Sequence, residues 1–122
     1  MKILIVEDEA IIARDIQNIV GRFGYQVSGL ASTGEESIQK ARDLNPDLVF
    51  MDIKLKGSMD GIEAGHAIHD HLHIPVVYLT AFGEEKILDG AHPHNGFMKI
   101  LKPFEEKDIQ CAIQMILPRN NN

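Results

Sequence analysis

The chain has 122 residues, of which 44% are apolar and 25% charged, and its formal net charge is −6. This length and composition are typical of one globular domain, and the acidic balance argues against a broad nucleic-acid surface, which needs clustered Lys and Arg. A single cysteine excludes an internal disulfide, and no apolar run is long enough for a signal peptide or a membrane span, so we expect a cytoplasmic protein without membrane partners.

The first part of the chain alternates short apolar runs with segments of helical periodicity. Runs rich in β-branched residues predict buried strands, and apolar residues three or four positions apart predict helices. The expected elements are a strand over 3–6, a helix from about residue 11 to Gly21 or Gly24, a strand over 26–31, and a helix over 34–44 that Thr33 caps with Glu36 as its capping-box partner.

The second part continues the same alternation from Pro46 onward. The expected elements are a strand over 48–53, a helix over about 62–72, a strand over 75–80, a short helix over about 83–89, a strand over 97–101 and a helix over 105–117. Residues 1–118 then form the domain, and residues 119–122 are expected to be a frayed polar tail. The connection 83–96 has few apolar residues and three glycines, which predicts low local stability.

Five strand-helix units in strict alternation predict an α/β fold with a doubly wound parallel sheet. For this number of units we expect the flavodoxin-like (βα)5 arrangement with strand order 2-1-3-4-5, whose switch point lies between the first and third strands.

Four strand ends carry polar residues that this topology would bring to one rim. Glu7 and Asp8 follow the first strand, and Asp52, Thr80 and Lys102 follow the third, fourth and fifth. Three crowded carboxylates need a cation to stay ionised, and a hard ion such as Mg²⁺ suits oxygen ligands. A carboxylate beside Mg²⁺ can attack phosphorus and form an aspartyl phosphate, whose charge the lysine and the hydroxyl would meet.

The chain resembles a response-regulator receiver domain of two-component signalling (CheY-like). The matching segments are ILIVEDE from Ile3, PDLVFMD from Pro46, MDG from Met59, PVVYLTA from Pro75 and LKPF from Leu101. This resemblance implies that Asp52 accepts a phosphoryl group from a histidine kinase or phosphotransfer domain, so that the chain is a signalling acceptor and not an enzyme. It also implies a Mg²⁺ site made by Asp8, Asp52, the backbone carbonyl of Lys54 and, through water, Glu7.

The resemblance further implies a switch. Thr80 would be the switch hydroxyl, Lys102 would pair with the phosphate, the peptide before Pro103 would be cis, and the surface around Thr80 and over 83–104 would change. The family often dimerises through its fourth and fifth helices, which leaves a homodimer through the 83–117 face as one expectation and a monomer as the other.

One position departs from the family pattern. Receiver domains usually carry Tyr or Phe three residues before the lysine that pairs with the phosphate, but here that position is Lys99, and Phe97 lies two residues earlier. We therefore expect the switch to work chiefly through Thr80 and the loop that follows it.

Three other interpretations remain open from the sequence. A Mg²⁺-dependent phosphatase would use the same aspartyl phosphate, but it generally needs a second acid two residues after the nucleophile, where this chain has Lys54. A flavin carrier would need a hydroxyl- and glycine-rich phosphate loop after the first strand, where the acidic residues 7–9 stand. His69 and His73 have the spacing of a helical metal pair, although exposed histidines explain them more simply.

Overall fold

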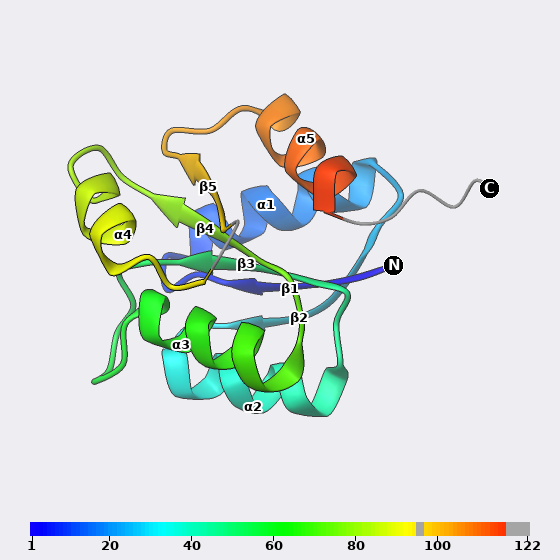
Figure 1. The fold of residues 1–122 in the computed structure, drawn as a ribbon. Coiled ribbons are helices and arrows are strands. Elements are labelled where there is room, and N and C mark those ends of the chain that lie inside the picture. The colour runs from blue at the N-terminus through cyan, green and yellow to red at the C-terminus, as the bar shows by residue number, and fades with distance from the viewer. Residues whose placement is uncertain (95–96, 117–122) are drawn as a thin grey trace.

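The computed structural model describes residues 1–94 and 97–116 and shows a parallel five-stranded sheet in the order β2-β1-β3-β4-β5. The predicted fold class and strand order are therefore confirmed (Figure 1). The elements in chain order are β1 (Lys2–Val6), α1 (Ala10–Arg22), β2 (Gln26–Ala31), α2 (Gly34–Leu44), β3 (Leu48–Asp52), α3 (Gly61–Ala67), a π-helical segment (Ile68–Leu72), β4 (Val76–Thr80), α4 (Glu85–Ala91), β5 (Met98–Leu101) and α5 (Glu106–Ile116).

The helices cover both faces of the sheet, with α1 and α5 on one face and α2 and α3 on the other (Figure 1). Successive residues of a strand point to opposite faces, so each central strand contributes to two cores. In β1, Ile3 and Ile5 pack with α1 and α5, whereas Leu4 and Val6 pack with α2 and α3. Continuous apolar runs are needed for this double burial, and all five residues of β3 are buried.

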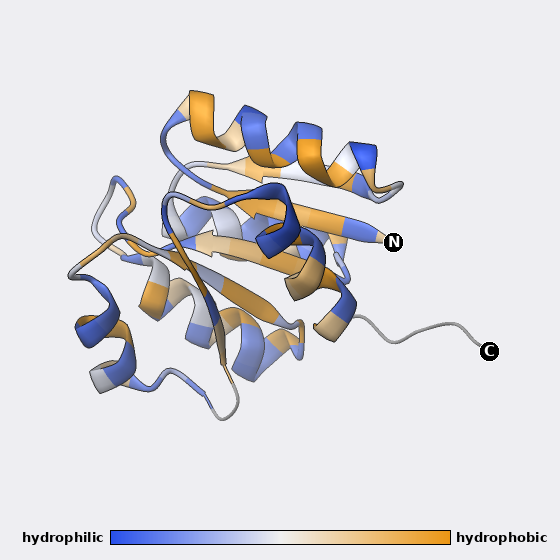
Figure 2. Ribbon diagram, turned by 90° about the horizontal axis from the view of Figure 1, so that it is seen from above, coloured by the Kyte–Doolittle hydropathy of each residue, from blue (hydrophilic) through white to orange (hydrophobic). Residues whose placement is uncertain are grey.

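The hydropathy pattern follows the same layers. Figure 2 shows mostly hydrophobic strands and helices that carry hydrophobic and hydrophilic residues in alternation along their length. In α1 the buried residues are Ala13, Ile16, Ile19 and Val20, which have the spacing of one helix face. None of the helices in the described ranges is long and apolar enough to cross a membrane.

Two glycines of α3 allow it to lie against the sheet beside the carboxyl end of β3. A Cβ atom on Gly61 would stand 1.8 Å from the carbonyl oxygen of Asp52, and one on Gly65 would stand 2.4 Å from the hydroxyl oxygen of Tyr78. Asp60 begins the helix with a complete capping box, because its side chain accepts from the Glu63 N–H while the Glu63 carboxylate accepts from the Asp60 N–H. The start of α3 is therefore fixed against Asp52.

Apart from shifts of one or two residues at element ends, such as the helix expected over 83–89 that runs over Glu85–Ala91, the structure departs from the predictions in two places. The helix expected over 62–72 is α-helical only from Gly61 to Ala67 and continues as the π-helical segment Ile68–Leu72. Thr33 caps α2 by accepting from the Glu36 N–H at 3.0 Å, but the Glu36 carboxylate accepts from the Ser32 N–H at 2.8 Å instead of completing a box with Thr33. The predicted tail over 119–122 lies outside the described residues.

Candidate functional site

The strand register places the predicted site residues at one rim of the sheet. In the parallel ladder Val6 pairs with Met51, so the next position along brings Glu7 beside Asp52. Asp52 itself pairs with Leu79, one residue before Thr80. The Lys102 N–H donates to the Thr80 carbonyl at 2.8 Å, which extends the ladder between β4 and β5 past the end of β5. Four strands thus deliver polar groups to their shared carboxyl edge, where open α/β sheets bind ligands.

Three carboxylates meet at this edge. Glu7, Asp8 and Asp52 each offer an oxygen, and these oxygens lie within 4.8 Å of one another. Glu7 and Asp52 are only 4% and 3% exposed, and Asp8 is half-buried. Such a set of hard oxygen donors fits a small divalent cation with some of its waters retained.

Lys102 pairs with both buried carboxylates. Its Nζ donates to Oδ1 of Asp52 at 3.0 Å and to Oε1 of Glu7 at 3.2 Å. Because neither carboxylate side chain is more than 5% exposed, these ion pairs are shielded from solvent and depend on one another.

Burial changes the titration of all three groups. Loss of solvation, together with the nearby charge of Asp52, raises the pKa of Glu7 to about 7, although Lys102 and the Glu9 N–H act in the opposite direction. Burial likewise raises the pKa of Asp52 against the hydrogen bond from Lys102. Burial acts to lower the pKa of Lys102, but its bonds to Asp52 and Glu7 outweigh this effect and raise it. Glu7 therefore holds its proton to a higher pH than an ordinary glutamate does.

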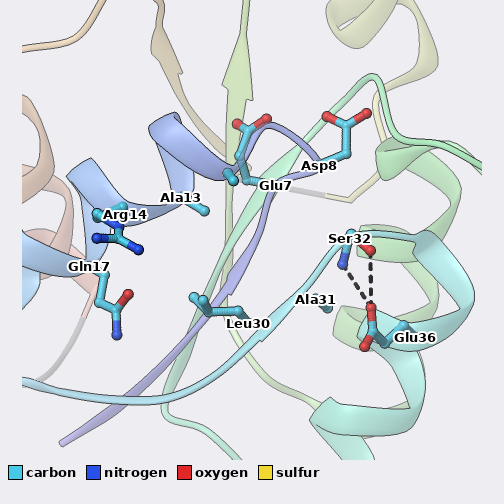
Figure 3. Close-up of a pocket in the computed structure, with 10 residues that line it drawn as sticks. Glu7, Asp8, Ala13, Arg14, Gln17, Leu30, Ala31, Ser32 and Glu36 are labelled. Carbon is cyan, nitrogen blue, oxygen red and sulfur yellow. Dashed lines mark hydrogen bonds between the residues drawn. The ribbon is translucent and has the colours of Figure 1, made fainter.

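A pocket opens beside the carboxylates, between α1 and the carboxyl end of β2. Figure 3 shows the residues that line it, with Glu7 and Asp8 on one side, Arg14 and Gln17 of α1 on a second, and Ser32 and Glu36 on a third. Two of the three clustered carboxylates, those of Glu7 and Asp8, thus line this pocket.

Thr80 ends β4 with its side chain completely buried. Its hydroxyl lies 3.4 Å from the Ala81 carbonyl oxygen, a long contact for a hydroxyl donor. This hydroxyl is therefore only weakly engaged.

The sequence analysis missed one residue at this edge, Glu84. Its carboxylate accepts from the Ala81 N–H at 2.9 Å and lies 3.4 Å from Nζ of Lys54. The spacing could have indicated this contact. An acid three residues after Ala81 can accept from the Ala81 N–H, which is one half of a capping box, even though Ala81 has no side-chain oxygen to supply the other half. The Lys54 side chain is exposed, and the metal-binding role expected for its carbonyl stays a prediction.

Lys99 takes part in an ion pair at the position where the family usually has an aromatic residue. Its Nζ lies 2.8 Å from Oδ1 and 3.0 Å from Oδ2 of Asp89 and 3.9 Å from Glu85, so β5 holds α4 through charge. Phe97 is partly buried and meets Tyr78 edge-on, with ring centroids 6.1 Å apart.

In the part of the chain that the structure describes, no group of three possible metal ligands includes His69 and His73. Among the described residues, only the Glu7, Asp8 and Asp52 cluster gathers three possible metal ligands. His69 instead stacks on His94 with ring centroids 3.8 Å apart, and Nδ1 of His66 contacts the carbonyl of Pro93. These contacts join α3 and the segment that follows it to the chain after α4.

Comparisons with known proteins agree with this geometry. A family model described as the response regulator receiver domain matches residues 3–114. The transcriptional regulatory protein PdtaR of Mycobacterium tuberculosis is 35% identical over 118 residues, which cover 97% of this chain and 57% of PdtaR. The chemotaxis protein CheY of Thermotoga maritima is 29% identical over 116 residues, which cover 94% of this chain and 96% of CheY. The chain thus spans a little over half the length of PdtaR.

Solved structures of receiver domains are also similar to this chain. The signal receiver domain of a modulated diguanylate cyclase from Desulfovibrio desulfuricans has a TM-score of 0.87 and 30% identity, covering 94% of this chain and 91% of that one. The receiver domain of NtrX from Brucella abortus has a TM-score of 0.84 and 28% identity, covering 93% and 96%.

Proposed function

The chain belongs to the response regulator receiver family and is a receiver domain of two-component signalling, and we propose that Asp52 is its phosphoacceptor. The observation that carries this proposal is the position of Asp52: it is buried at the carboxyl edge of the sheet, among two further carboxylates and within 3.0 Å of Nζ of Lys102. Receiver domains are signalling acceptors of phosphoryl groups, and we assign this chain the same role without turnover of small substrates.

Magnesium is the cofactor that fits the acidic cluster. Receiver domains generally bind Mg²⁺ in an acidic pocket, and here Asp8 and Asp52 would hold the ion directly, with Glu7 acting through water and the Lys54 carbonyl completing the set. When bound, the ion neutralises the charge that develops on the transferred phosphoryl oxygens.

The protein's own groups would supply the rest of the chemistry. A carboxylate oxygen of Asp52 forms the new bond to phosphorus while the bond from phosphorus to the donor's histidine nitrogen breaks, and its electron pair stays on that nitrogen. Lys102 moves from the carboxylates to the phosphoryl oxygens and offsets their charge. Thr80 donates its weakly engaged hydroxyl to a phosphoryl oxygen, which connects the modification to the loop after β4.

Small-molecule labelling tests the assignment. Incubation with acetyl phosphate and Mg²⁺ should add one phosphoryl group per chain, measured by intact mass, and EDTA should prevent it. Asp52→Asn should abolish the gain. Asp47→Asn is the matched control, because Asp47 accepts from the Lys2 N–H at the opposite edge of the sheet and should not affect labelling. Continuous hydrolysis of varied phosphoesters would favour a phosphatase instead.

The partners we propose are a histidine kinase or phosphotransfer domain as the donor and a second copy of this chain at the 83–117 face. The dimer is supported by a groove between β5 and α5 in which Leu101 and Met115 are 42% and 73% exposed. Sedimentation velocity with and without beryllofluoride would detect an association that depends on the phosphorylated state. A monomer in both conditions would remove the dimer from the proposal.

A further inference from the structure

The carboxylate of Glu84 accepts a hydrogen bond from a backbone N–H at the rim of the site. The Ala81 N–H, which directly follows Thr80, donates to Oε1 of Glu84 at 2.9 Å, and the Glu84 N–H donates back to the Ala81 carbonyl at 3.0 Å. The Glu84 side chain is 13% exposed, so the carboxylate lies mostly out of solvent. The loop between β4 and α4 is thereby closed on itself by a negative charge.

The same carboxylate also pairs with the ammonium group of Lys54 in the neighbouring loop. Oε2 of Glu84 lies 3.4 Å from Nζ of Lys54, whose side chain is otherwise 77% exposed. Lys54 stands two residues after Asp52, and Ala81 stands one residue after Thr80. Glu84 therefore bridges the two loops that leave β3 and β4 next to the acceptor carboxylate and the hydroxyl.

An anion on Asp52 would compete with Glu84 for both partners. A backbone N–H and an ammonium group are the donors that a phosphoryl oxygen prefers, and a phosphoryl group carries nearly two negative charges at neutral pH. Such a group would attract both donors and repel the carboxylate that now holds them.

We propose that Glu84 is a latch: an internal anion that keeps the Ala81 N–H and Lys54 in the unphosphorylated arrangement and is displaced when Asp52 is modified. The inference rests on Asp52 being the phosphoacceptor. Displacement would reach the surface directly, because the Glu84 carbonyl accepts from the Ile87 and Leu88 N–H groups in the first turn of α4 at 3.0 and 3.1 Å. Ile87 is 60% exposed, so movement of this turn changes the exposed apolar surface.

Beryllofluoride binding in the presence of Mg²⁺ tests the latch. Glu84→Ala removes the competing anion and should tighten beryllofluoride binding by about threefold to tenfold, measured by titration calorimetry. Glu84→Gln keeps the hydrogen-bond acceptor but loses the charge, so its affinity should lie between those of Glu84→Ala and the wild type. Glu85→Gln is the matched control: Glu85 contacts Lys99 instead, and its affinity should equal that of the wild type. Thermal unfolding of each variant confirms that it is folded.

The Ala81 amide gives a second readout, in both the wild-type protein and the Glu84→Ala variant. Its NMR signal should shift on beryllofluoride binding, and in Glu84→Ala its exchange with solvent should be faster before beryllofluoride is added. Wild-type binding without a gain in either Glu84 variant would overturn the latch alone, as would an unchanged Ala81 signal. No binding to the wild-type protein would overturn the assignment of Asp52 and the latch with it.

Discussion

The buried carboxylate of Glu7 should make the metal-free protein less stable as the pH rises. The pKa of this group is about 7 in the folded protein, against 4.5 for an ordinary glutamate, because burial and Asp52 disfavour its charge. Between these two values the folded state binds more protons than the unfolded state, so the free energy of unfolding falls with increasing pH. The stabilisation is complete below pH 4.5 and is lost as the pH passes through about 7.

The difference between the folded and unfolded pKa of Glu7 gives the order of magnitude of this loss of stability. One pKa unit corresponds to about 1.4 kcal/mol, so the difference between the two Glu7 values amounts to about 3 kcal/mol. The raised pKa of Asp52 acts in the same direction. Glu36 has a lowered pKa and loses its contribution only as the pH falls below the ordinary glutamate value, so it does not interfere in this range.

Urea unfolding in EDTA, followed by circular dichroism between about pH 5 and about pH 8, measures this loss. Glu7→Gln is the control and should flatten most of the pH dependence, because the amide does not titrate. Added Mg²⁺ should restore stability at the alkaline end, since the cation offsets the repulsion among the carboxylates. A free energy of unfolding that is constant or rises over this range in EDTA would refute the electrostatic account of the cluster.

Three further changes test packing and charge around the site, each by urea unfolding. Tyr78→Phe should raise stability by up to about 1 kcal/mol, because the buried hydroxyl has no hydrogen-bond partner in the described part of the chain. A loss of stability would contradict this by showing that the hydroxyl does form a hydrogen bond. Gly65→Ala should cost about 2 kcal/mol or more, because its Cβ would stand 2.4 Å from that hydroxyl, and a neutral result would contradict the close approach. Lys99→Ala should cost less than about 1 kcal/mol, because Lys99 and Asp89 are partly exposed; high salt should erase the loss, and a salt-resistant loss would indicate packing instead.

Much of this fold follows from periodicity alone. Residues 3–6 and 48–51 are apolar on both faces, which only a sheet covered on two sides accommodates, and five strand-helix units permit few topologies. Parallel strands then place Glu7, Asp52 and Lys102 at the same edge without further information. The acidic cluster could be predicted from the sequence because its members stand at or directly after the carboxyl ends of β1 and β3.

What the sequence did not reveal depends on side-chain geometry in loops. Glu84 is an ordinary loop acid until its carboxylate is seen on the Ala81 N–H. Lys99 was visible as a departure from the family, but its pairing with Asp89 depends on how closely α4 lies beside β5. The stacked ring of His69 likewise depends on a contact with a residue 25 positions away, which no helical spacing predicts. Periodicity determines which face a residue occupies and leaves its partner across a loop undetermined.

The most direct test of the central claim is to find where the phosphoryl group goes. After labelling with acetyl phosphate and Mg²⁺, borohydride reduction converts an aspartyl phosphate to homoserine, and peptide mass spectrometry locates it. We expect homoserine at position 52 and nowhere else, and none when Mg²⁺ is withheld. Homoserine at any other aspartate, or an unmodified Asp52 in protein that has gained a phosphoryl group, would contradict the account.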